Sequence, residues 1–66
     1  MKLVVNGEPR ECDAGVTVAG LLDTLDVDLR QIAVERNLEI VPRSTYASQQ
    51  LAEGDQIEIV EFIGGG

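Results

Sequence analysis

Hydrophobic and polar positions follow the period of short strands at the start of this chain. Residues 2–6 form an aliphatic run closed by Asn6-Gly7, a dipeptide typical of a type I′ hairpin turn. Residues 8–13 are the expected returning strand, and Pro9 lies near its start, where a missing backbone donor is tolerated. The pattern therefore predicts a β-hairpin.

A helical period follows the hairpin. Four apolar residues recur at the spacing i, i+3, i+4, i+7, namely Val18, Leu21, Leu22 and Leu25. Thr17 precedes them and can cap the helix N-terminus. Three acidic residues toward the end, Asp23, Asp26 and Asp28, oppose the helix dipole. We therefore expect a short helix with one apolar stripe facing a sheet.

The second half of the chain predicts another hairpin. Strands are expected over residues 32–36 and 39–41, joined across Asn37-Leu38, where Asn37 can adopt a left-handed conformation. Pro42 ends the second of these strands.

A loop and a last strand complete the pattern. Ser44 is expected to cap a short turn that runs through Tyr46. A turn over residues 53–55 then leads into the most apolar strand, over residues 57–63. The order of elements is hairpin, helix, hairpin, loop and strand.

This order predicts an α+β fold, with one main helix on a mixed sheet of four or five strands. Parallel pairing of the first and last strands at the centre would make it a β-grasp fold. Period-two alternation then turns Ile57 and Ile59 toward the helix and Val4, Val60 and Phe62 toward the open face. Such an apolar patch suggests a docking surface. The alternative is scattered surface apolarity, because a one-residue register error would exchange the faces.

Composition narrows the functional classes. A chain of 66 residues makes one domain with no room for a deep catalytic cleft. It has no histidine and one cysteine, which excludes His-based acid/base catalysis, a Cys/His zinc site and an intramolecular disulfide. A binding or carrier role without a metal is favoured.

The chain is acidic along its length. The 12 acidic and 5 basic residues give a formal charge of −7. This charge disfavours nucleic acid as a partner, because binding to phosphates needs clustered Lys and Arg. The acidity fits either steering toward a basic protein partner or solubility alone. No apolar run is long enough for a membrane span or signal peptide, so we expect a cytoplasmic protein.

Three glycines, Gly64, Gly65 and Gly66, directly follow the last strand. Three extended residues span on the order of 10 Å, and glycine lets another protein's channel close around the backbone. We interpret residues 1–63 as the domain and residues 64–66 as a flexible tail that delivers the Gly66 carboxylate to an enzyme. The alternative is an inert tail.

The single cysteine, Cys12, allows two interpretations. It can be a small apolar filler at the edge of the core, as is common for cysteine, or it can carry a persulfide. No Lys or His adjoins it in sequence to favour the thiolate, and Arg10 is the basic residue that would share its strand face. We therefore favour the filler.

Together these residues resemble the ThiS family of small sulfur carriers in thiamine thiazole biosynthesis. The resemblance covers essentially the whole chain. The segments that carry it are Asn6-Gly7, Gly15 before Thr17-Val18, Leu21-Leu22, Ile40-Val41-Pro42-Arg43, the run from Gly54 to Ile59, and the terminal glycines. Two features depart from the family pattern: Leu38 stands where glycine often follows Asn37, and the chain has a third terminal glycine.

The resemblance implies a ubiquitin-like β-grasp protein that is a cosubstrate rather than an enzyme. A ThiF-type enzyme would use ATP to adenylate the Gly66 carboxylate, a donor such as a cysteine desulfurase would supply sulfur, and the thiocarboxylate would serve a ThiG-type thiazole synthase. Gly64 and Gly65 would thread narrow channels. The ATP site lies on the partner, because this chain has no phosphate loop and binds no cofactor itself. The expected partner-binding surface is Val4, Val60, Phe62 and Ile63.

Other fates of the same carboxylate stay open. Related β-grasp carriers serve molybdopterin synthesis, tRNA thiolation or cysteine synthesis. A ubiquitin-like modifier would instead form amide bonds to lysines of target proteins. A third alternative is an interaction domain with an inert tail.

Overall fold

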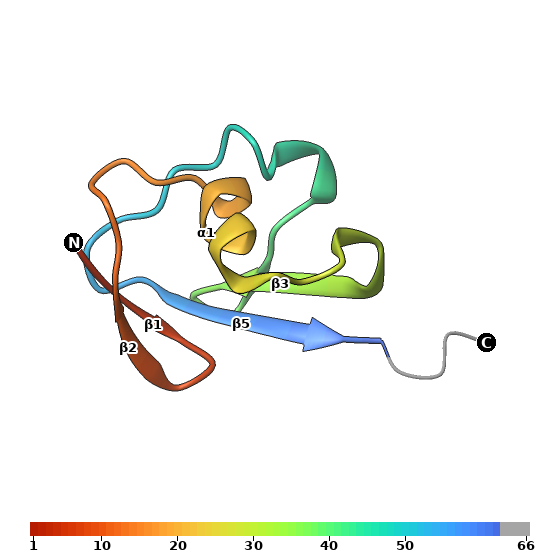
Figure 1. Ribbon diagram of the computed structural model, residues 1–66, viewed down its shortest axis with the longest axis horizontal. Coiled ribbons are helices and arrows are strands. Elements are labelled where there is room, and N and C mark those ends of the chain that lie inside the picture. Colours follow the sequence, from red (N-terminus) through yellow and green to blue (C-terminus); the bar gives the residue numbers. More distant parts are fainter. Residues whose placement is uncertain (63–66) are drawn as a thin grey trace.

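The computed structural model describes residues 1–62. Within them the chain forms five strands, one α-helix and two short 3-10 helices (Figure 1). In chain order these are β1 (Lys2–Val5), β2 (Glu8–Glu11), α1 (Val18–Leu25), η1 (Leu29–Gln31), β3 (Ile32–Arg36), β4 (Glu39–Ile40), η2 (Arg43–Thr45) and β5 (Gln56–Glu61). The predicted order of elements is confirmed, although β2 ends at Glu11, two residues before its expected end.

The five strands form one mixed sheet in the order β2-β1-β5-β3-β4. The strands β1 and β5 pair in parallel, with Val4 opposite Gln56 and Val5 opposite Ile57, whereas the other pairs are antiparallel. Helix α1 crosses one face of this sheet (Figure 1). The first and last strands are therefore neighbours at the centre, which confirms the α+β, β-grasp prediction.

Both hairpins turn through a pair of residues with positive φ. In the first turn φ is 50° at Asn6 and 82° at Gly7, as the type I′ prediction requires. In the second turn φ is 51° at Asn37 and 72° at Leu38. Leu38 is therefore a bulky residue in a conformation that favours glycine.

Replacing Leu38 with glycine is expected to stabilise the fold. A left-handed conformation costs a residue with a Cβ about 1–2 kcal/mol, and the Leu38 side chain is 88% exposed, so little packing is lost. The greater freedom of glycine in the unfolded chain offsets about 0.5–1 kcal/mol. A net gain of about 0.5–1 kcal/mol should appear in urea unfolding. The control is Leu38→Ala, which removes the side chain but keeps the strained φ, and an equal gain in both variants would contradict the explanation.

Helix α1 begins and faces the sheet as its sequence predicts. The Thr17 Oγ1 accepts a hydrogen bond of 3.1 Å from the Gly20 N–H, which caps the N-terminus. The residues of the helix that are buried against the sheet are Val18, Leu21 and Leu22. The helix ends at Leu25, and Asp26 follows in a left-handed conformation with φ 55°. Asp28 lies beyond the helix and instead caps η1.

The predicted cap at Ser44 is wrong. Ser44 lies inside η2, and the residue before this helix is Pro42, which makes no side-chain capping bond. The hydroxyl of Thr45 instead donates a 2.8 Å hydrogen bond to the Pro42 carbonyl oxygen. Proline is tolerated at this place, because its restricted φ fits the observed value of −62° and the N–H groups at the start of a helix have no partner within the helix.

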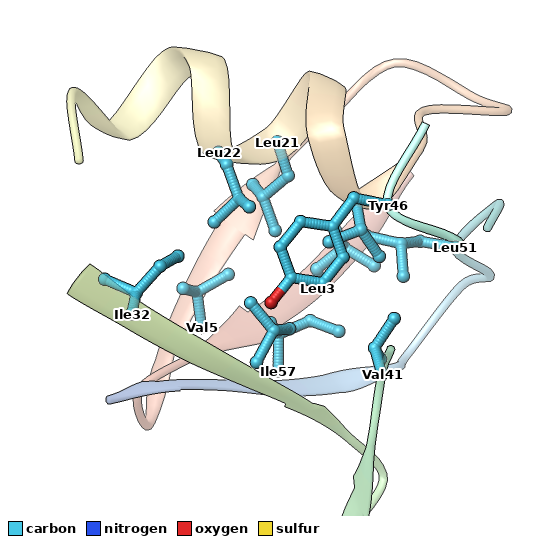
Figure 2. Packing of buried hydrophobic residues seen from close by; sticks show 11 residues of the cluster. Leu3, Val5, Leu21, Leu22, Ile32, Val41, Tyr46, Leu51 and Ile57 are labelled. Carbon is cyan, nitrogen blue, oxygen red and sulfur yellow. The ribbon is translucent and has the colours of Figure 1, made fainter. Parts of the chain in front are cut away.

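The core lies between α1 and the helix-facing side of the sheet. Its buried apolar residues are Leu3, Val5, Val18, Leu21, Leu22, Ile32, Val34, Val41, Tyr46, Leu51 and Ile57. Figure 2 shows Leu21 and Leu22 reaching from the helix toward Val5 and Ile32, with Tyr46 beside them. The inward orientation predicted for Ile57 is confirmed, and Leu3 and Val5, the neighbours of Val4 on β1, are buried as well.

A buried carboxylate, Asp55, ties the second hairpin to the start of β5. Its Oδ2 accepts hydrogen bonds of 2.8 Å from the Arg36 Nε and the Ala52 N–H, and its Oδ1 accepts one of 3.0 Å from the Asn37 Nδ2. Burial alone would raise the pKa of Asp55. The hydrogen bonds from Asn37, Arg36 and Ala52 outweigh burial and hold the pKa below its ordinary value. The sequence pattern marked Asp55 only as part of a turn.

Candidate functional site

The open face of the sheet, which is the face away from α1, carries the predicted docking residues. Val60 is 50% exposed, Phe62 is 53% exposed and Val4 is half-buried. The predicted orientation of Val60 and Phe62 is therefore confirmed, whereas their role in partner binding stays a prediction. The site residues that lie outside the described residues are Ile63, Gly64, Gly65 and Gly66.

Ile40 extends this face and was not predicted as a site residue. Its side chain is 64% exposed. The register places Ile40 opposite Glu35 on β3, and Glu35 opposite Glu58 on β5. Period-two alternation contained the signal, because the next residue, Val41, is buried.

The segment between α1 and β3 holds Phe62 in place. The Phe62 N–H donates a 2.7 Å hydrogen bond to the Gln31 carbonyl oxygen. The Arg43 guanidinium donates to the carbonyl oxygen of Leu29 and, at 2.8 Å, to that of Ile32. Arg43 therefore joins η2 to the segment on which Phe62 rests. The sequence marked Arg43 only through the family resemblance.

Asn6 prolongs the contact between the first hairpin and β5. Its N–H donates a 2.8 Å hydrogen bond to the Ile57 carbonyl oxygen. Its side-chain Oδ1 accepts one of 2.7 Å from the Ile59 N–H. The turn residue thus continues the parallel pairing beyond the end of β1 and supports β5 on the way to Phe62.

Cys12 is half-buried and packs against the core, as the filler interpretation expects. Its N–H donates a 2.8 Å hydrogen bond to the Met1 carbonyl oxygen. The Arg10 guanidinium reaches the Thr24 hydroxyl on α1, at 3.4 Å. Cys12 therefore contributes packing at the edge of the core.

Acidic residues occur throughout residues 1–62, from Glu8 to Glu61. In this part of the chain no three His, Cys, Asp or Glu residues come together in a group able to hold a metal ion. An exposed hydrogen bond from Arg30 lowers the pKa of Asp28 at the start of η1. None of the described helices is long and apolar enough to cross a membrane.

One helix on a mixed sheet, with the first and last strands parallel at its centre, defines a β-grasp domain of the ubiquitin-like class. The domain has exposed apolar side chains on β5 and directly after it, and its sequence continues into three glycines. The chain belongs to the ThiS family, whose sequence model matches residues 3–66.

Similar proteins agree with this assignment. The sulfur carrier protein ThiS of Escherichia coli is 38% identical over 66 residues, which cover 100% of both chains. The crystal structure of a thiamine biosynthesis protein (ThiS) from Geobacter metallireducens superposes with a TM-score of 0.86 at 35% identity and covers 100% of both chains. A thiazole synthase of Paramagnetospirillum magneticum is 61% identical over 66 residues, which are 100% of this chain and 20% of that protein. The chain thus spans about a fifth of the thiazole synthase relatives that it matches.

Proposed function

We propose that this chain carries sulfur for thiazole formation in thiamine biosynthesis. The observation that carries the proposal is the match of nearly the whole chain to the ThiS family, on a β-grasp fold. The pathway is supported by the two relatives named thiazole synthase, each of which contains a segment similar to all 66 residues. In this role the chain is a protein cosubstrate and not an enzyme.

The reacting group in this proposal is the carboxylate of Gly66. With a reference pKa of about 3.3–3.7 an α-carboxylate is ionised at neutral pH, and its oxygen is a poor leaving group. Attack of this oxygen on the α-phosphorus of ATP releases pyrophosphate and forms an acyl adenylate. The outer sulfur of a persulfide on the donor can then displace AMP from the acyl carbon, which gives an acyl disulfide. Attack by a thiol on the S–S bond releases the thiocarboxylate and leaves that thiol joined to the donor in a disulfide.

Three partners supply what this chain lacks. A ThiF-type enzyme binds ATP and forms the adenylate, a donor such as a cysteine desulfurase supplies sulfur, and a ThiG-type thiazole synthase accepts it. The need for ATP in the first of these steps supports a cytoplasmic protein. Val4, Val60, Phe62 and Ile63 dock on the partners while Gly64 and Gly65 enter their channels.

Intact-mass analysis of the protein isolated from its own cells tests the proposal. A mass change equal to one oxygen-to-sulfur exchange supports a sulfur carrier. Conjugates of higher mass would indicate a ubiquitin-like modifier, and an unchanged mass under thiamine limitation would indicate an inert domain. Deletion of the gene should cause a thiamine requirement, whereas a requirement for molybdopterin, thiolated tRNA or cysteine would assign a different carrier pathway.

The Phe62→Ala variant is expected to weaken docking with little loss of stability. The side chain is half exposed, so truncation removes little buried area, whereas an aromatic anchor at an interface commonly contributes about 2 kcal/mol or more. We expect the dissociation constant for the ThiF-type enzyme to rise at least about tenfold. Isothermal titration calorimetry measures the dissociation constant. The control is Leu38→Ala, which truncates an exposed side chain in the turn between β3 and β4. Equal losses in both variants would contradict the anchor role.

A further inference from the structure

Two glutamates face each other across the centre of the open face. The register of β3 and β5 places Glu35 directly opposite Glu58. Both alternate with residues that face the helix, since Val34 and Ile57 are buried. Side chains at directly opposed positions are neighbours about 5 Å apart at Cβ, and like charges there destabilise the sheet.

No basic side chain relieves this pair within residues 1–62. The three ion pairs of this part of the chain involve other groups, namely the N-terminus with Glu11, Arg30 with Asp28, and Arg36 with Asp55. Arg10 reaches Thr24 on the helix side, and Arg43 binds the carbonyl oxygens of Leu29 and Ile32. Lys2 lies at the start of β1, opposite Glu11 and away from the pair.

Aliphatic side chains border the two glutamates, of which Glu58 is exposed and Glu35 is half-buried. Exposed Ile40 is opposite Glu35, and Val60, also exposed, is opposite Ala33 one step along the same face. We call Glu35, Glu58, Ile40 and Val60 the acidic face. It is continuous along β5 with Phe62, two residues beyond Val60. A pair of uncompensated charges bordered by aliphatic side chains is complementary to a cation presented by an apolar surface.

We propose that the acidic face binds an arginine side chain of the ThiF-type enzyme when that enzyme docks beside Phe62. This inference rests on the proposed function and names the chemistry of the partner surface. Arginine fits because its planar guanidinium can donate to two carboxylates at once and is only weakly hydrated. Lysine, a point charge, would satisfy the pair less completely. Binding therefore removes a repulsion that the free protein retains.

This arrangement has a signature that ordinary surface acidity lacks. Neutralising one glutamate removes the cross-strand repulsion and so stabilises the free protein. The same change removes half of the site for the arginine and so weakens the complex. Stability and affinity must therefore move in opposite directions, whereas a structural role would move them together.

The experiment compares Glu35→Gln, Glu58→Gln and the double variant with Asp23→Asn. Asp23 is exposed on α1, in the layer opposite the acidic face, so its variant makes the same change in net charge without touching the face. We expect Glu58→Gln to raise the melting temperature by about 2–4 °C and to raise the dissociation constant for the ThiF-type enzyme about tenfold at low salt. The affinity of the variants should also fall less steeply with added NaCl than that of the wild type.

The outcomes separate this inference from the proposed function. If Glu58→Gln and Asp23→Asn weaken binding equally, general charge steering explains the effect and the arginine site is refuted. If Phe62→Ala still weakens binding in that case, and the protein still acquires the thiocarboxylate mass, the proposed function stands. A Glu58→Gln variant that binds less well but is also less stable would equally overturn the inference. A charge swap would identify the arginine. The Glu58→Lys variant should bind poorly to the unchanged enzyme and regain affinity for an enzyme in which that arginine is replaced by glutamate.

Discussion

The Gly65→Val variant is expected to lose adenylation almost completely while its fold stays intact. In sequence the substitution follows β5 and all the core residues among residues 1–62, so we expect the melting temperature not to change. If the glycines thread a narrow channel, a β-branched side chain collides with its walls and restricts the backbone. Displacement of a reacting group by about 1 Å can lower the rate about 100-fold, and we expect at least this loss. ATP–pyrophosphate exchange with the ThiF-type enzyme measures it.

The matched control for this prediction is Gly65→Ala. A methyl group is the smallest side chain that can be added, so the loss should be graded with size and smaller than for valine. Competition with the unmodified chain adds a second readout, because a variant that docks through Phe62 but cannot react should act as an inhibitor. Normal exchange by Gly65→Val would refute the threading role of the glycines.

Replacement of Asp55 with asparagine is expected to cost about 2–3 kcal/mol of unfolding free energy at neutral pH. The carboxylate accepts hydrogen bonds from Arg36, Asn37 and Ala52. The isosteric amide has an NH₂ group in place of one acceptor oxygen, so it would face at least one of these N–H groups with another N–H group. It would also leave the partly buried Arg36 guanidinium without a countercharge. Urea denaturation measures the loss. The control, Asp23→Asn, removes the same charge from an exposed position and should change stability by less than about 0.5 kcal/mol.

This loss is expected to depend on pH in a defined direction. The pKa of Asp55 is lowered in the folded protein, so its contribution to stability is fully present above the unfolded pKa, about 3.9. The contribution is lost as the pH falls from that value through the lower pKa of the folded state. The difference in unfolding free energy between the wild type and Asp55→Asn should therefore be constant from pH 7 to about pH 5 and shrink below pH 4. A difference that stays constant down to pH 2 would refute the assignment.

Elements with local causes could be predicted from the sequence. Asn6-Gly7 specifies its turn because both residues tolerate positive φ, and Thr17 caps α1 because its hydroxyl reaches an N–H three residues ahead. The cap expected at Ser44 failed because Pro42 starts the helical turn without a side-chain acceptor. The Asn37-Leu38 turn formed although Leu38 is unsuited to it, since pairing of the flanking strands outweighs the local strain.

The candidate site was predicted in part. With Ile57 assigned to the core, the alternation along the last strand correctly predicted that Val60 and Phe62 are exposed. Ile40 was missed although it alternates with buried Val41, because so short a strand offers only one such alternation. Gln31, which binds the Phe62 N–H, has no sequence signal at all, because its contribution is a backbone carbonyl.

The sequence by itself determined the strands, helix α1, their order and the inward and outward positions of β5, and the family resemblance added an expected role for the three glycines. It did not predict the 3-10 helix η1. Only the tertiary structure decided which distant residues meet: Asp55 with Arg36, Phe62 with Gln31, and Glu35 with Glu58. The reason is one of range. Turn chemistry, capping and periodicity act within a few residues, whereas the neighbours of a strand and its register are set when the whole core packs. The glycines after the last strand were readable from the sequence, whereas the charged and apolar surface beside that strand appeared only in the folded sheet.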